Sequence, residues 1–157
     1  MGKRIITLGT WDGKPIEWIV LRNDKVGTLV ISKNSLFNSY FDNDSNDWKK
    51  SNIRKYLNND FYNKAFSEID KKNIINAKLE DVNDSKDNVF ILSKTEAETL
   101  LTDEERKIGT EWLLRSPHSS KNTSIWFVEN SGEFGYFQGY NINQKMGVVV
   151  ALYIMER

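Results

Sequence analysis

The chain has 157 residues, enough to form one domain with a substantial hydrophobic core. Hydrophobic residues make up 39% and charged residues 28%, a balance typical of globular proteins. Lys plus Arg and Asp plus Glu both number 22, so no net charge attracts nucleic acid or an anionic membrane surface. We therefore expect a single domain over residues 1–157, without a nucleic-acid partner.

Cysteine is absent, which excludes disulfides, thiol nucleophiles and thiolate metal sites. His118 is the one histidine, and zinc or copper sites usually need several histidine or cysteine ligands, so we expect no metal centre and no cofactor. No apolar run approaches the roughly 18–20 residues of a membrane-spanning helix, and the N-terminus lacks the apolar core of a signal peptide. These features predict no membrane insertion and a cytoplasmic location, unless a leader was removed from a secreted or surface-displayed protein.

The first third of the chain predicts short β-strands at residues 4–8, 16–21 and 28–32. Asp-Gly at residues 12–13 predicts a tight turn between the first two strands. A polar turn at residues 23–25 predicts that the last two strands form an antiparallel hairpin.

Helices follow in the middle of the chain. Apolar residues recur at helical spacing after Ser51, which is a candidate N-cap, and a second helix is predicted from about Ser67, with Ile69 and Ile74 inward. Residues 89–92 predict a short buried strand. Beyond it, Ser93 and Thr102 are each followed three residues later by glutamate, and these two capping boxes predict two further helices.

The last third returns to strands. A strand is predicted at 112–117, then a polar loop to Ser124, then a hairpin that rises through 125–128 and returns after Gly132. Residues 148–154 are apolar at nearly every position, which predicts one strand buried on both faces, central in its sheet and near the N-terminal strands. The order of strands, helices and strands predicts an α+β domain.

Several motifs, in this order along the chain, resemble an uncharacterised bacterial family, the domain of unknown function numbered 6273. The family has a W-x-x-S-x-[IL]-R-x-[WY]-L-N helix start, a [VI]-F-[IL]-L-S junction, a W-L-R-S-P strand, a V-x-x-x-G hairpin and a G-V-R-P-A-L closing strand. The matching residues are Trp48 to Asn58, Val89 to Ser93, Trp112 with Leu114 to Pro117, Val128 with Gly132, and Gly147-Val148 with Ala151-Leu152. The chain departs from the closing motif, because Val149 and Val150 replace its Arg-Pro pair.

The resemblance implies a C-type-lectin-like fold, related to the formylglycine-generating enzymes. Such a fold has a mostly antiparallel sheet, two or three flanking helices and a long loop region that displays ligand-binding residues. It hosts sugar binding, protein binding and oxidase chemistry, so the fold alone does not give the function. The oxidase branch uses active-site cysteines, and their absence excludes that chemistry here.

Residues 42–47 resemble the start of a calcium loop, with oxygen-bearing side chains at alternate positions. The match then fails, because Asp47 stands where the loop needs glycine and Ile53 where it needs glutamate. We interpret the segment as a solvated acidic turn.

Arg115 stands in an apolar strand, and arginine is rarely buried unless it is paired. Either a carboxylate or loop carbonyls hold it as a structural anchor, or it faces a ligand. His118 has serines nearby, but neighbours in sequence rarely form a catalytic triad, so we interpret it as a loop histidine.

A binding surface is predicted on the loops 118–123 and 136–143, which combine polar residues with aromatic rings that stack on ligands at low entropic cost. The alternative is cross-strand aromatic pairs that only stabilise the sheet, beside ordinary solvated loops. The candidate ligand-binding residues are Arg115, His118, Asn122, Trp126, Tyr136 and Tyr140.

The leading hypothesis is a non-enzymatic recognition module that binds a glycan or a protein surface. An alternative is an enzyme with a carboxylate-based cleft, for which Glu111, Glu129 and Glu133 are the nearby acids, although they show no recognisable pair. A third hypothesis is a structural or assembly domain of a larger surface or phage-like particle.

Overall fold

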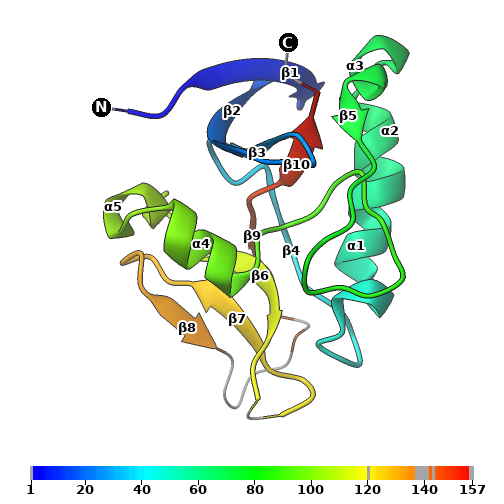
Figure 1. The fold of residues 1–157 in the computed structure, drawn as a ribbon. Helices are drawn as coiled ribbons and strands as arrows, with labels where there is room; N and C mark the ends of the chain where they lie inside the picture. The colour runs from blue at the N-terminus through cyan, green and yellow to red at the C-terminus, as the bar shows by residue number, and fades with distance from the viewer. Residues whose placement is uncertain (1, 120, 137–141, 143, 156–157) are drawn as a thin grey trace.

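The computed structural model describes residues 2–119, 121–136, 142 and 144–155. These residues form two sheets flanked by short helices, and neighbouring strands are antiparallel with one exception (Figure 1). The predicted α+β class is therefore confirmed. Within the described residues, no helix is long and apolar enough to cross a membrane.

The first sheet has the strand order β1-β2-β3-β10-β5, and every neighbouring pair is antiparallel. The predicted turn between β1 and β2 is confirmed, because Asp12 and Gly13 both adopt positive φ, at 50° and 75°. The β2–β3 hairpin is also confirmed. The strands of this sheet are β1 (Ile5–Trp11), β2 (Lys14–Asn23), β3 (Thr28–Ser32), β5 (Ile74–Ile75) and β10 (Ala151–Ile154).

The second sheet has the strand order β4-β9-β6-β7-β8. Its β6–β9 pair is parallel, and its other pairs are antiparallel. The strand at 112–117 and the hairpin after it are confirmed as β6, β7 and β8. The strands of this sheet are β4 (Phe37–Ser39), β6 (Trp112–Pro117), β7 (Ile125–Val128), β8 (Phe134–Tyr136) and β9 (Met146–Val148).

The segment 148–154 is central, as predicted, but it is not one strand. It ends β9 at Val148, crosses from the second sheet to the first through Val149 and Val150, and continues as β10. Ser32 holds the crossing, since its N–H donates to the Val150 carbonyl (2.8 Å) and its Oγ accepts from the Val150 N–H (3.0 Å). Burial on both faces explains the error, because a crossing between two sheets is as apolar as a continuous strand.

The predicted helix starts are confirmed. Ser51 Oγ accepts the Arg54 N–H at 3.2 Å, and Ser67, Ser93 and Thr102 each form a reciprocal capping box. The helices, including a 3-10 turn and a π turn, are η1 (Trp48–Lys50), α1 (Asn52–Tyr56), η2 (Leu57–Phe61), α2 (Tyr62–Ala65), α3 (Glu68–Lys72), α4 (Lys94–Leu100) and α5 (Asp103–Arg106). In Figure 1, α4 and α5 lie beside the second sheet, and α1 to α3 lie on the other side of the molecule.

Two local predictions are wrong. Ile69 is 74% exposed rather than inward, because α3 has only five residues and the chain has already become strand β5 at Ile74. Residues 89–92 are buried, but they form no strand and make one isolated bridge, between Phe90 and Ala151. This segment is apolar because it packs between the layers, not because it joins a sheet.

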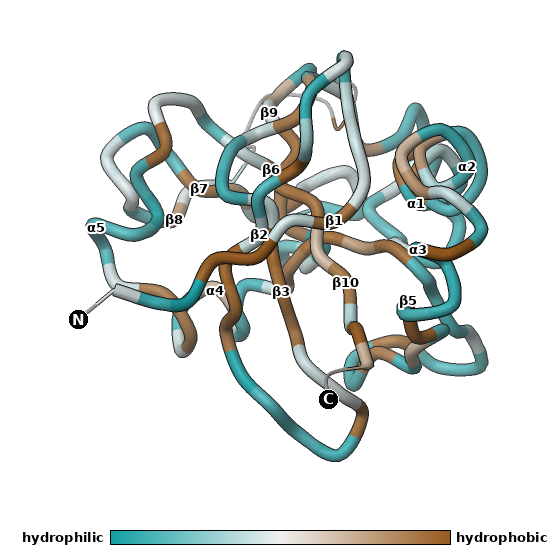
Figure 2. The backbone as a smooth tube through the Cα atoms, turned by 90° about the horizontal axis from the view of Figure 1, so that it is seen from above, coloured by the Kyte–Doolittle hydropathy of each residue, from teal (hydrophilic) through white to brown (hydrophobic). Residues whose placement is uncertain are grey.

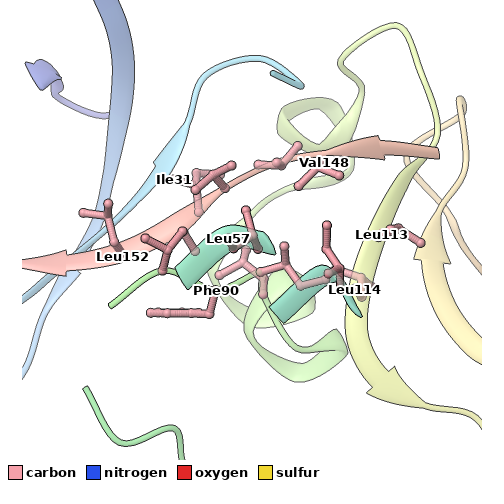
Figure 3. Close-up of a cluster of buried hydrophobic side chains, with 14 of the residues drawn as sticks. Ile31, Leu57, Phe90, Leu113, Leu114, Val148 and Leu152 are labelled. Carbon is pink, nitrogen blue, oxygen red and sulfur yellow. The ribbon is translucent and has the colours of Figure 1, made fainter. Parts of the chain in front are cut away.

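The core lies where the two sheets and the α1–α2 run meet. Figure 2 shows the apolar residues concentrated in the central strands, and Figure 3 shows the buried side chains that join the layers. The labelled members of this cluster are Ile31, Leu57, Phe90, Leu113, Leu114, Val148 and Leu152.

Candidate functional site

The polar residues of the first sequence motif hold the segment 86–89 against the helices. Trp48 Nε1 donates to Asp87 Oδ2 at 3.0 Å, and Arg54 Nε forms an ion pair with the other oxygen of Asp87. Asn58 donates to the Val89 carbonyl at 2.8 Å and accepts from the Val89 N–H at 3.0 Å. Asp87 is buried, and its oxygens accept hydrogen bonds from within the protein, so these contacts stabilise the fold and leave Asp87 no access to a ligand.

Arg115 is 1% exposed. Its guanidinium donates to Asp81 and Glu96, both at 2.6 Å, and to the Ile91 carbonyl at 2.8 Å. Burial alone lowers the pKa of Arg115, but the charges and hydrogen bonds of Glu96 and Asp81 raise it above its ordinary value. These contacts are those of the structural anchor considered above, and a direct role of Arg115 in ligand binding stays a prediction.

The ionic network continues beyond Arg115 to residues that the sequence did not single out. Arg22 Nη2 lies 3.8 Å from Glu96 Oε2 and donates to the Tyr153 hydroxyl at 3.2 Å, and Arg22 Nε donates to Asp24 at 3.0 Å. The Tyr153 hydroxyl donates to the same Asp24 oxygen at 2.8 Å. Arg22, Asp24, Glu96 and Tyr153 line a pocket of 550 Å³.

The charge states in this pocket follow from its contacts. Burial alone raises the pKa of Asp24, but hydrogen bonds from Tyr153 and two backbone N–H groups, with the charge of Arg22, lower it below its ordinary value. Burial and Asp24 raise the pKa of Tyr153 although Arg22 opposes them, so the hydroxyl stays protonated. The sequence indicates this pocket only weakly. Arg22 follows the apolar residues of a strand, and Tyr153 is a residue with a hydroxyl group in an otherwise apolar run.

The structure brings together three of the predicted site residues, His118, Trp126 and Tyr136, here called the aromatic surface. The His118 and Tyr136 rings stack, with centroids 3.5 Å apart and an interplanar angle of 5°. Trp126 meets them edge-on, at 4.7 Å from His118 and 5.6 Å from Tyr136. The Lys94 ammonium lies over the Trp126 ring at 4.8 Å. All three rings are half-buried, so the surface is accessible but held by its own contacts.

The neighbouring loop is anchored by Asn46. Asn122 is exposed, and its carbonyl accepts the Asn46 N–H at 2.9 Å, while the Asn46 amide donates to the Ser124 carbonyl at 2.7 Å. This places Asn122 on an ordered loop. Tyr140, with most of the predicted loop 136–143, lies outside the described residues.

The acids of the enzyme hypothesis lie on the second sheet and its turn. Glu129 and Glu133 flank the turn between β7 and β8, where the Glu129 N–H donates to the Glu133 carbonyl at 2.8 Å. Glu133 lines an open depression together with Arg106 and Phe134, and Glu111 stands directly before β6. Of the three acids, Glu133 alone lines this depression, which it shares with four acids of helices α4 and α5: Glu98, Asp103, Glu104 and Glu105.

The acidic segment 42–47 forms a turn that its own carboxylate closes. Asp42 accepts the N–H groups of Asp44, Ser45 and Asn52 at 3.0–3.1 Å. Burial alone raises the pKa of Asp42, but these backbone hydrogen bonds lower it below its ordinary value. Over the described part of the chain, no group of three or more His, Cys, Asp and Glu residues could hold a metal ion.

Comparison with known proteins gave no match to a curated protein and none to a solved structure. One family model matches residues 26–155, from the turn before β3 to the residue after β10. The match covers both sheets except β1 and β2, and it includes all the motifs, from Trp48 to Leu152, that carry the resemblance to this family. The chain therefore belongs to the family described as Domain of unknown function (DUF6273).

Proposed function

We propose that this domain is a C-type-lectin-like recognition module without enzymatic activity, and that it binds carbohydrate at the aromatic surface. The observation that carries the proposal is the contact of His118, Trp126 and Tyr136, which come from three separate segments. The mostly antiparallel sheets, the flanking helices and the loop after β6 support the lectin-like part of the proposal.

The aromatic surface is pre-organised for binding. Each ring is held by the other two, and Lys94 fixes one side of Trp126, so little side-chain entropy remains to be lost. Half-buried tryptophan and tyrosine offer apolar rings for the C–H faces of a sugar. Asn122, exposed on the anchored loop, adds hydrogen-bonding groups for sugar hydroxyls.

Size favours carbohydrate over a protein surface. A stable protein interface buries about 800 Å² on each partner, far more than three half-buried rings present. The large exposed apolar side chains of the described residues are Ile5, Val26, Ile69 and Met155, and none of them belongs to the aromatic surface. An assembly domain needs a large contiguous apolar face, and three half-buried rings are too small for one.

The enzyme alternative has weaker support. Asp24 and Glu96 share one pocket, but both lie beside Arg22, and Glu96 is also paired with Arg115. The lowered pKa of Asp24 keeps it ionised at neutral pH, whereas a carboxyl general acid needs a raised pKa.

The test is a glycan array probed with the folded wild-type domain and with a Trp126→Ala/Tyr136→Ala double variant. We expect saturable binding by the wild type and at least a tenfold loss in the double variant, about the effect of removing two stacking rings. Tyr62→Ala is the matched control, because Tyr62 is another half-buried ring with a lysine over it, Lys71 at 4.9 Å. It should bind like the wild type.

Circular dichroism and thermal unfolding establish that each variant is folded. Full glycan binding by a folded double variant contradicts the placement of the site. Absence of any glycan ligand, together with capture of a defined protein that requires Trp126, favours the protein-surface alternative. Chemical change of a bound glycan favours the enzyme.

A further inference from the structure

A second pocket lies away from the aromatic surface, between the β2–β3 turn, strand β10, helix α4 and the segment 78–80. Its volume of 550 Å³ falls within the usual range of small-molecule sites, roughly 300–1,000 Å³. The Arg22–Asp24–Tyr153 hydrogen-bond cluster forms one wall. Buried Leu79 and the Tyr153 ring supply apolar surface, and exposed Val26 extends it.

Two polar atoms in the wall have unused hydrogen-bonding capacity. Among the described residues, Arg22 Nη1 donates to nothing, while its Nε and Nη2 are engaged with Asp24 and Tyr153. Glu96 Oε1 is used by Ser93 and Arg115, but Glu96 Oε2 accepts no hydrogen bond in the described residues and lies 3.8 Å from Arg22. A guanidinium donor and a carboxylate acceptor therefore stand side by side.

The charges that line the pocket balance. Arg22, Lys25 and Lys78 are opposed by Asp24, Glu80 and Glu96. Lys25, Lys78 and Glu80 are exposed and pair with no other described residue, so they remain available to a ligand. A ligand of one charge sign would meet repulsion from half of this lining, whereas a ligand that carries both signs would not.

We propose that this pocket binds a small zwitterion with an apolar body, the chemistry of an α-amino acid with an aliphatic side chain. The carboxylate lies against Arg22, with Lys25 and Lys78 at the rim, in the geometry that guanidinium and carboxylate groups favour. The ammonium group donates to Glu96, and the aliphatic side chain packs on Leu79 and the Tyr153 ring. A free amino acid carries both charges on one carbon, and a short peptide carries the same two charges farther apart, at its two termini.

The experiment is an NMR titration of the uniformly ¹⁵N-labelled wild-type domain with L-leucine. We expect saturable shifts of the Arg22, Lys25, Glu96 and Tyr153 amides and a Kd of about 1 mM or tighter, the affinity open to a ligand with so few atoms. N-acetyl-leucine lacks the ammonium group and leucinamide lacks the carboxylate. Each should bind at least about tenfold more weakly, because N-acetyl-leucine offers no charged donor to Glu96 and leucinamide offers no carboxylate to Arg22.

Leucyl-leucine identifies the source of the zwitterion. Tighter binding of leucine assigns the pocket to free amino acids, and tighter binding of leucyl-leucine assigns it to short peptides with both termini free. The proposal is overturned if leucine gives no saturable shifts, if the shifts centre on His118 and Trp126, or if the three single-residue ligands bind equally.

Variants of the rim test the site without touching the fold. Lys25→Gln/Lys78→Gln should weaken leucine binding about threefold to tenfold, since two exposed charges are lost. Lys14→Gln/Lys55→Gln removes two exposed lysines that do not line this pocket and should leave the Kd unchanged. Equal effects of the two double variants would show a general charge effect and overturn the assignment. Glu96 is left intact because it caps α4 and holds Arg115.

Discussion

Replacing Arg115 with alanine removes the central cation of the buried ionic network. The change breaks the hydrogen bonds to Asp81, Glu96 and the Ile91 carbonyl. It also leaves a cavity where one of the largest fully buried side chains stood. The consequence depends on what remains behind, because each former partner of Arg115 must then find water or stay unpaired.

The former partners of Arg115 differ in how easily water can replace the lost hydrogen bond. Asp81 is 42% exposed and can be solvated again, so it adds little to the loss. Glu96 is only 11% exposed, and the Ile91 residue is fully buried, so a carboxylate and a carbonyl lose a partner inside the protein. Breaking such a buried pair costs about 3–5 kcal/mol. For a domain of this size the melting temperature should fall by roughly 6–20 °C.

Urea unfolding at pH 7, followed by tryptophan fluorescence, measures this loss. Lys3→Ala is the control, because it breaks the 2.8 Å ion pair between Lys3 and Glu105, two side chains that are each about one-third exposed. This change should cost about 0–1 kcal/mol. Asp81→Ala should cost much less than Arg115→Ala. An Arg115→Ala variant within about 1 kcal/mol of the wild type would refute the anchor and return Arg115 to the ligand-binding hypothesis.

Three further predictions concern Asp42 and the glycine turns. Asp42→Asn should destabilise the domain by about 1–3 kcal/mol at pH 7, measured by urea unfolding. Folding lowers the pKa of Asp42, so the wild type should be more stable than the variant above about pH 4 and should lose this advantage as the pH falls through the folded-state pKa. Gly132→Ala should lower the melting temperature more than Gly13→Ala. Both glycines have positive φ, but only at Gly132 would the new methyl group meet a backbone atom, the Asp103 carbonyl oxygen. Equal losses would contradict this close packing of Gly132 against Asp103. Millimolar calcium should not stabilise the domain, and a rise of several degrees in melting temperature would contradict the interpretation of residues 42–47 as an acidic turn.

The features that sequence patterns predicted well are local. Ser51, Ser93 and Thr102 cap helices because a cap needs only a side-chain oxygen and a backbone N–H two or three residues away. The Asp12-Gly13 turn likewise depends on the φ angles that those two residues tolerate. Such features are encoded in a few adjacent residues, so the rest of the fold did not change them.

Patterns of burial were less informative about what buries a residue. The segments 89–92 and 148–154 are both apolar and both buried. Segment 89–92 forms only an isolated bridge, whereas segment 148–154 crosses from one sheet to the other. Ile69 shows the converse, because helical spacing continued in the sequence after the helix itself had ended. Hydrophobicity reports the loss of water and does not identify the neighbour that displaces it.

The candidate sites show the same division. The sequence singled out His118, Trp126 and Tyr136 because these residue types suit recognition and lie within 19 positions of one another. It could not place the His118 ring parallel to that of Tyr136, since that contact depends on the pairing of β6 with β7 and of β7 with β8.

By itself, the sequence determined the fold class, the family, the helix caps and the absence of cysteine chemistry, because these follow from residue type and short-range spacing. Only the tertiary structure decided that Arg22, Glu96 and Tyr153 share one pocket. These residues are separated by 74 and 57 positions, and they meet because β10 pairs with β3 and α4 packs beside them. Charged groups interact strongly only when they lie within a few ångströms of one another, and for residues far apart in the sequence the tertiary fold sets those distances.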